Sequence, residues 1–154
     1  MNRALGIDYG DARVGVAVSD ELGMLAHPLE TVPHRASQPL SQDSPAIQRI
    51  VTLLTEKKAD TIVLGLPKNM NGTTGESAEK VKKFADALRE ALQGRAVTIR
   101  FVDERLTTVA AHRMLQDAGK TAKQSKALVD QVAAQQILQC WLDSQALLSP
   151  PPLD

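Results

Sequence analysis

The chain has 154 residues, of which 43 % are hydrophobic but only 3 % aromatic, and its 18 basic residues balance its 18 acidic ones. This length suits one domain that buries about 70 % of the surface of its unfolded chain, and the single cysteine, Cys140, excludes an internal disulfide. A net charge of zero argues against nucleic-acid binding through bulk charge alone, so any such binding requires a local basic patch.

Five runs rich in β-forming residues predict strands. The first two flank the turn residues Tyr9-Gly10-Asp11-Ala12 and are expected to form a hairpin. The fourth is a continuous apolar run that ends before Pro67, a pattern typical of a strand buried on both faces. The expected strands cover residues 3–8, 13–19, 24–32, 61–66 and 96–102.

Apolar residues at helical spacing predict four helices. The first begins at Pro45, with Ser44 as its N-cap. The other three cover residues 74–92, 107–118 and 125–142. The stretch 33–45, with three prolines and little apolar content, is expected to be a mobile surface loop. Three closely linked strands followed by alternating helices and strands predict an α/β fold with a five-stranded mixed sheet flanked by helices. Its first three strands are expected to be antiparallel and the later ones parallel.

The ends of the chain carry their own expectations. We expect a single domain over residues 1–144 and a disordered, proline-rich tail over residues 145–154. The amino-terminal segment turns polar at Asp8, and no later apolar run reaches the roughly 18 residues of a membrane span. We therefore expect a cytoplasmic protein without a membrane partner, acting as a monomer or a weak homodimer.

Two acidic sites lie at the ends of predicted strands. Asp8 ends the first strand between Gly6 and Gly10, and Glu104 follows Asp103 at the end of the last strand. Ligands of open sheets bind at the carboxyl ends of the strands, which favours a functional role. An acid at either place can also be a turn or capping residue, and strand alternation does not tell whether Asp103 or Glu104 faces Asp8.

A third acid lies in a predicted helix. Asp130 shares the apolar stripe of Ala133, Ala134, Ile137 and Trp141, so its carboxylate points toward the sheet. Burying an unpaired carboxylate costs several kcal/mol, so Asp130 needs a cation or a wet crevice. An ion pair with Lys126 or an arginine, or a favourable place in the first helical turn, would satisfy it equally well.

Convergence of Asp8, Glu104 and Asp130 would create strong repulsion, which divalent metal ions relieve. Carboxylate oxygens without a histidine or cysteine cluster favour Mg²⁺ or Mn²⁺ over Zn²⁺. Two such ions can activate a water molecule and stabilise the leaving oxygen in phosphodiester hydrolysis. The three histidines are scattered, which disfavours a zinc site or a serine–histidine–aspartate triad.

Substrate contacts are expected around these acids. The turn over residues 65–75 carries glycines, amides and hydroxyls at a helix start, which suits a phosphate but also an ordinary loop. The candidate substrate-binding residues are Arg13, Lys68, Asn71, Arg105, Thr107 and Lys126. The lysines at 80, 82 and 83 fit a solvated helix face better.

Four groups of residues, in this order and over nearly the whole chain, resemble the YqgF (RuvX) family. They are Gly6-Ile7-Asp8-Tyr9-Gly10 with residues 13–20, Gly65-Leu66-Pro67 with Asn71-Gly72 and Gly75, residues 103–108, and Lys126 through Asp130 to Ala134. The resemblance implies a ribonuclease H-like fold and maturation of the 5′ end of pre-16S rRNA, or Holliday junction resolution. It places the family's acidic positions on Asp8, Glu104 and Asp130. Members of the wider superfamily carry an acid where this chain has Gly65-Leu66-Pro67, so Glu104 is expected to take that role.

Three rival functions are open. Junction resolution would require a dimer that presents two sites to two strands. An actin-like or sugar-kinase ATPase also begins with an Asp-x-Gly hairpin, but it usually has two duplicated lobes and this chain has one such hairpin. A non-catalytic RNA-binding or ribosome-assembly module would keep the fold and not need the acids.

Overall fold

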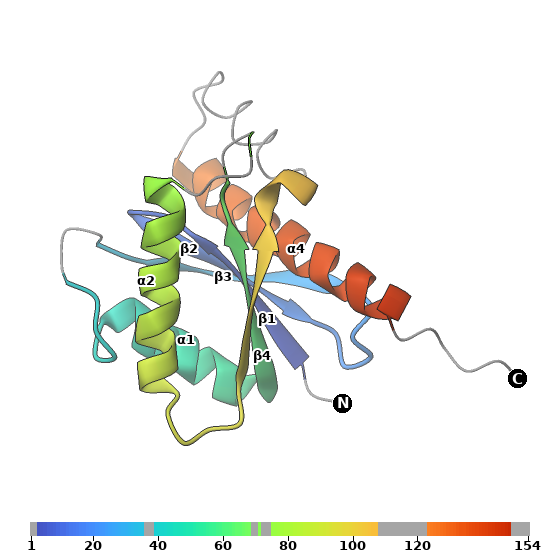
Figure 1. Cartoon of the computed structure of the whole chain (residues 1–154), viewed down its shortest axis with the longest axis horizontal. Coiled ribbons are helices and arrows are strands. Elements are labelled where there is room, and N and C mark those ends of the chain that lie inside the picture. Colours follow the sequence, from blue (N-terminus) through green and yellow to red (C-terminus); the bar gives the residue numbers. More distant parts are fainter. Residues whose placement is uncertain (1–2, 36–38, 69–70, 72–74, 108–122, 149–154) are drawn as a thin grey trace, which may run out of the picture.

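A five-stranded sheet with helices on both faces forms the protein (Figure 1). The computed structural model describes residues 3–35, 39–68, 71, 75–107 and 123–148, with the backbone alone for residues 123–127. The described elements are β1 (Arg3–Tyr9), β2 (Arg13–Ser19), β3 (Ala26–Pro33), α1 (Pro45–Glu56), β4 (Ala59–Leu66), α2 (Glu76–Ala91), β5 (Thr98–Asp103), the 3₁₀ turn η1 (Glu104–Leu106) and α4 (Lys123–Leu148).

The sheet has the strand order β3-β2-β1-β4-β5. Strands β1, β2 and β3 pair antiparallel, whereas β4 pairs in parallel with both β1 and β5. This confirms the predicted mixed sheet. Pro28 has no backbone N–H to donate to a neighbouring strand, and it lies in the edge strand β3. It pairs with Ala17, and the β2–β3 register shifts between Val16 and Ala17.

The strand boundaries differ from the prediction where local hydrogen bonds hold the chain in a turn. β3 begins at Ala26, two residues late, because the Asp20 carboxylate accepts hydrogen bonds from the backbone N–H groups of Met24 and Leu25. β5 begins at Thr98 rather than at residue 96, because the N–H of Arg95 donates to the carbonyl of Leu92 and continues the turn after α2. β1 extends one residue further, through Tyr9.

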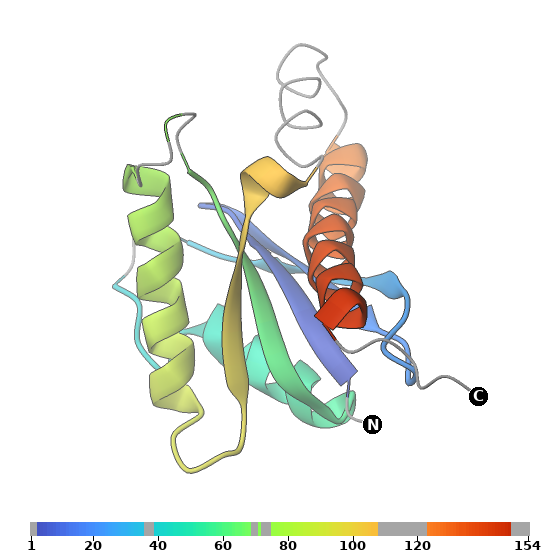
Figure 2. The same ribbon diagram turned by 45° about the vertical axis from the view of Figure 1, so that its right-hand side comes forward.

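The two faces of the sheet have separate cores. Helices α1 and α2 cover one face, where Leu5, Ile7 and Phe84 are fully buried. Helix α4 crosses the other face, and Figure 2 shows the sheet between α2 and α4. A Cβ atom on Gly6 would lie 2.6 Å from the Cβ of Leu138, so α4 packs directly on the backbone of β1.

Helix α4 is longer than predicted. It begins at Lys123 and runs through Leu148, so residues 145–148 of the expected tail are helical, and residues 149–154 lie outside the described residues. The apolar stripe ends at Leu142, but nothing in the next six residues breaks a helix before Pro150. The predicted helix over 107–118 lies outside the described residues except for Thr107, which follows η1.

Two further expectations concern the loop and membranes. The described parts of the loop between β3 and α1, residues 34–35 and 39–44, contain no helix or strand, as predicted, although Pro33 and Pro45 belong to β3 and α1. Among the helices that the structure describes, none is both long enough and apolar enough to cross a membrane.

Candidate active site

Asp8 lies on the face of the sheet that α4 covers. In β1 the side chain of Ala4 and the open side of Gly6 face α4, so alternation places Asp8 on the same face, near the carboxyl end of the strand. Its side chain is buried, with 6 % of the residue exposed. Asp8 pairs with Gly15 in β2, and it lies beside Gly65 in β4, one residue beyond the pair Ile7 and Leu64.

Gly15 brings Asp130 next to Asp8. A Cβ atom built on Gly15 would lie 2.0 Å from the carbonyl oxygen of Asp130 and 3.1 Å from its Cβ atom. The first described turns of α4 therefore rest directly on the strand next to Asp8. Ala133, Ala134 and Ile137 of α4 are buried against the sheet, which confirms the predicted apolar stripe, while Trp141 is half-buried.

Gly65 brings Glu104 to the other side of Asp8. A Cβ atom on Gly65 would lie 2.9 Å from Oε1 of Glu104 and closer still to Cδ1 of Ile137, so this carboxylate and the Ile137 side chain share the space that a side chain at Gly65 would fill. Val102 packs in the core under α4, and Glu104, two residues later, lies on the same face and is 6 % exposed. This answers the question left open by alternation: Glu104, not Asp103, faces Asp8.

Asp103 has a local role. Its carboxylate accepts hydrogen bonds from the backbone N–H of Arg105, at 2.9 Å, and from the guanidinium of Arg105, with Nη2 at 2.6 Å from Oδ2. These bonds hold the pKa of Asp103 below its ordinary value, with a smaller contribution from the charge of Lys68. The hydroxyl of Thr107 donates to the carbonyl of Glu104 at 2.8 Å. Together these contacts fix the turn η1 that carries Glu104.

The three predicted acids thus form one row across the sheet, in the order Asp130, Asp8, Glu104, which we call the acidic row. The outer two are aligned over Gly15 and Gly65, on either side of Asp8. Adjacent strands lie about 4.8 Å apart, so the row fits within three strands. Among the described residues, however, no three histidine, cysteine, aspartate or glutamate side chains are close enough to hold a single metal ion.

Asp130, at one end of the acidic row, forms an ion pair with an arginine. Nε of Arg13 lies 2.7 Å from Oδ2 of Asp130, a contact that links β2 to α4. The two side chains are 42 % and 23 % exposed, so the pair is at the rim of the site. The sequence left an ion pair of Asp130 with Lys126 or an arginine open. The structure shows the pair with Arg13, and the side chain of Lys126 lies outside the described residues.

Comparison with known proteins places the chain among relatives. The family model described as "RuvX: Holliday junction resolvase" matches residues 2–144. The chain belongs to the RuvX family. Relatives described as "Putative pre-16S rRNA nuclease" include proteins of Acetivibrio thermocellus, 44 % identical over 93 % of this chain and 96 % of the relative, and of Clostridium novyi, 46 % identical over 92 % and 98 %.

The fold has relatives among solved structures. The structure described as "T. thermophilus RuvC in complex with Holliday junction substrate" is similar with a TM-score of 0.58 and 19 % identity, over 99 % of this chain and 100 % of that one. A second Thermus thermophilus RuvC structure has a TM-score of 0.52 and 18 % identity, over 93 % and 95 %. At this level of identity the likeness concerns the fold, which is the ribonuclease H-like fold expected of RuvX.

The remaining residues that were predicted to bind substrate lie at different distances from the acidic row. Arg105 and Lys68 lie near Asp103, next to the acidic row, and Thr107 directly follows η1. Asn71 is exposed beyond β4. The side chain of Lys126 lies outside the described residues. Sequence reasoning missed Gly15 as a neighbour of Asp130, although a glycine inside an otherwise branched strand is a signal of close backbone approach.

Proposed function

We propose that this RuvX-family chain is a cytoplasmic, metal-dependent nuclease that hydrolyses RNA phosphodiester bonds, and that it processes the 5′ end of pre-16S rRNA. The observation that carries the proposal is the acidic row at the carboxyl end of β1, with two buried carboxylates at its centre and on one side. The names of the curated relatives supply the substrate. The proposed catalytic and metal-binding residues are Asp8, Glu104 and Asp130.

The chemistry of these residues fits a hard divalent cation. Asp8 and Glu104 are carboxylates withdrawn from water, where a nearby cation lowers the cost of their burial. Carboxylate oxygens without nitrogen or sulfur donors suit Mg²⁺ or Mn²⁺. We propose that Asp8, Glu104 and Asp130 hold two such ions, which would supply an activated water molecule and stabilise the leaving oxygen.

The basic residues around the acidic row would position the substrate. Arg13 neutralises Asp130 at 2.7 Å, and its guanidinium has further donors that can bind a phosphate oxygen. Asp103 orients Arg105 next to Glu104. Lys68 and Asn71 lie after β4, on the path from the row toward α2. We propose that these residues, with Thr107 and Lys126, bind the RNA backbone, which explains how a chain of zero net charge holds RNA.

The test removes one carboxylate at a time without changing side-chain size. Asp8→Asn, Glu104→Gln and Asp130→Asn are each expected to lower Mn²⁺- or Mg²⁺-dependent cleavage of an RNA that spans the 5′ boundary of pre-16S rRNA by at least about a hundredfold. The matched control is Asp143→Asn, the same substitution on the exposed side of α4, which should cleave normally. Wild-type cleavage by the Asp8→Asn protein would end the catalytic claim.

A second measurement separates metal binding from activity. An ion that binds only the folded state raises the unfolding temperature, so Mn²⁺ should stabilise the unchanged protein and the Asp143→Asn control. It should stabilise the Asp8→Asn and Glu104→Gln proteins less. Equal stabilisation of all four proteins would show that the metal binds elsewhere.

Holliday junction resolution is the second candidate. It is favoured by the description of the matching family model and by the RuvC-like fold. A synthetic four-way junction assayed beside the RNA separates the two. Cleavage of the junction with no cleavage of the RNA would replace our first candidate with the second.

A further inference from the structure

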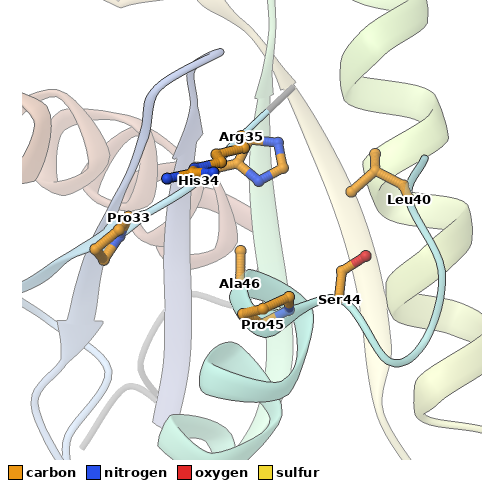
Figure 3. Close-up of a pocket in the computed structure, with 7 residues that line it drawn as sticks. All are labelled: Pro33, His34, Arg35, Leu40, Ser44, Pro45 and Ala46. Carbon is orange, nitrogen blue, oxygen red and sulfur yellow. The ribbon is translucent and has the colours of Figure 1, made fainter. Parts of the chain in front are cut away.

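Two adjoining cavities lie on the face of the sheet opposite to the acidic row. The first, of about 350 Å³, is lined by His34 and Arg35 on one side and Leu40 on the other, with Pro45 and Ala46 from the start of α1 at its base (Figure 3). Its volume falls in the usual range for small-ligand sites, which begins near 300 Å³.

The second cavity continues the first along α2. It has a volume of about 530 Å³ and lies between Leu40, Tyr9 and the exposed side of α2 that carries Lys80 and Lys83. Leu40 lines both cavities, so we treat them as one, the flanking groove, defined by Tyr9, His34, Arg35, Leu40, Lys80 and Lys83.

The flanking groove is at the same end of the sheet as the acidic row. Tyr9 directly follows Asp8 in β1 and faces the opposite side, where it packs against the α1–α2 core. His34 follows the carboxyl end of β3. An RNA strand bound at Asp8 therefore needs only to pass the end of the β1–β2 hairpin to enter the groove.

Aromatic contacts make the wall of the groove rigid. The hydroxyl of Tyr9 and Nε2 of His34 are 3.1 Å apart, and their rings meet edge to face with centroids 5.2 Å apart. Both rings also pack on the buried Phe84, with centroids 5.0 and 5.8 Å away. A wall that is ordered before binding loses little entropy when a flat ligand packs against it.

Charge in the flanking groove is positive at the end near Tyr9. Lys80 pairs with Asp11 at 3.1 Å, while Lys83 and Arg35 form no ion pair among the residues that the structure describes. The acidic residues Asp86 and Glu90 line the distant end, along α2, and Arg89 pairs with Asp86. An anionic group would therefore bind next to Tyr9, at the end closer to the acidic row.

We propose that the flanking groove binds an unpaired nucleotide of the RNA strand, next to the segment that lies on the acidic row. Its base packs against Leu40 and the Tyr9–His34 wall, and its phosphates contact Arg35 and Lys83. Stacking surfaces combined with cations are how proteins hold single strands, whereas a duplex cannot insert a base into such a hollow. The inference rests on the proposed nuclease function, because only a substrate bound at Asp8 makes this groove its neighbour.

The test measures binding without cleavage. Fluorescent single-stranded RNAs of about four and about twelve nucleotides are titrated in EDTA at several salt concentrations. The double variant Arg35→Ala, Lys83→Ala should bind the longer RNA about tenfold more weakly. The slope of its plot of log affinity against log salt concentration should be shallower by about 1.4, because each lost phosphate contact reduces the slope by about 0.7. Leu40→Ala should weaken binding with the slope unchanged, because it removes no charge.

A matched control removes the same two charges elsewhere. Lys58 and Arg95 line another cavity, of about 310 Å³, at the amino ends of β4 and β5, and their double alanine variant should bind both RNAs normally. Circular dichroism and the unfolding temperature show that each variant is folded. Equal loss of affinity in both double variants, or no loss in the groove variant, would each overturn the proposal.

Cleavage assays keep this test distinct from that of the proposed function. If the groove variants weaken RNA binding while no variant or condition gives cleavage, the nuclease function fails, and the groove remains an RNA-binding site without an active site beside it. If the protein cleaves RNA and the groove variants bind it normally, the groove proposal fails alone.

Discussion

Two glycines determine how closely the rest of the site approaches Asp8. Gly15 and Gly65 lie on the strands on either side of Asp8. The backbone of Asp130 takes the space of the missing side chain at Gly15, and Ile137 and the carboxylate of Glu104 take that at Gly65. The Glu104 carboxylate, carried by the turn after β5, thus lies over the end of β4, where the family resemblance leads us to expect it. This supports the role that the family resemblance gives to Glu104.

We expect Gly15→Ala to displace α4. The added Cβ would lie 2.0 Å from the carbonyl oxygen of Asp130, a backbone atom that cannot turn away, so the helix must shift. Overpacking of this kind costs about 1–3 kcal/mol, and we expect at least about 2 kcal/mol in urea unfolding, together with loss of RNA cleavage.

Gly94→Ala is the matched control for this substitution. Nothing lies within 4 Å of its Cβ position, but its φ of +82° is unfavourable for alanine. We expect a cost of about 1 kcal/mol and normal cleavage. A Gly15→Ala protein that is as stable and active as the control would contradict the packing of α4 on β2.

The sequence indicated the acids but not their partners. Asp8 and Glu104 could be predicted because they lie at the ends of recognisable strands, and Asp130 because it interrupts an apolar stripe. The contact of Arg13 with Asp130 joins residues 117 positions apart, and no local pattern encodes it. The choice between Asp103 and Glu104 likewise could not be made from the sequence, because it depends on the face of β5 that helix α4 covers.

At the scale of elements, an ion pair joins β3 to α1. Nε and Nη2 of Arg49 donate to the two carboxylate oxygens of Glu30 at 2.7 and 2.6 Å. These hydrogen bonds hold the pKa of Glu30 below its ordinary value, against the opposing effect of burial. The pair connects the start of the helical layer to the edge strand.

Glu30→Gln should therefore lower stability in a pH-dependent way. Because the pKa is depressed in the folded state, the contribution of Glu30 is fully present above the ordinary glutamate value of about 4.3 and is lost as the pH falls through the folded value. In urea unfolding we expect the variant to be less stable at pH 7, with the difference shrinking below about pH 4.

A double-mutant cycle provides the control. In an Arg49→Met background, Glu30→Gln should no longer produce this pH dependence, because the hydrogen-bond donor is gone. A pH dependence that persists without Arg49 would assign the effect to another group.

Local patterns predicted the existence of elements better than their ends. The strand at residues 13–19 and the helix start at Pro45 agree with the sequence, since a turn and a proline at the first helical position mark them. The start of β3 could not be predicted, because it depends on hydrogen bonds to the Asp20 side chain. The extension of α4 beyond Leu142 was missed because an apolar stripe reports what a helix buries, not where it ends.

At the scale of the whole molecule, α4 covers one face of the sheet. Its residues Ile137 and Leu138 are fully buried, and Leu142 is nearly so. The last turns behave differently, because Leu147 and Leu148 are 84 % and 76 % exposed. The match to the RuvX family also ends at residue 144. The fold therefore depends on α4 as far as Leu142 and not on the residues after Ser144.

Two truncations test this division. A chain that ends at Ser144 should unfold at nearly the same temperature as the full chain and should cleave RNA normally, since it loses only exposed side chains of α4 among the described residues. A chain that ends at Gln136 loses Ile137, Leu138 and Leu142, at about 1.5–3 kcal/mol each. That loss is comparable to the whole stability of a small domain, about 5–15 kcal/mol, so this chain should not fold cooperatively. Cooperative unfolding of the shorter chain, or marked destabilisation of the longer one, in thermal scans would show that the sheet does not depend on α4 in this way.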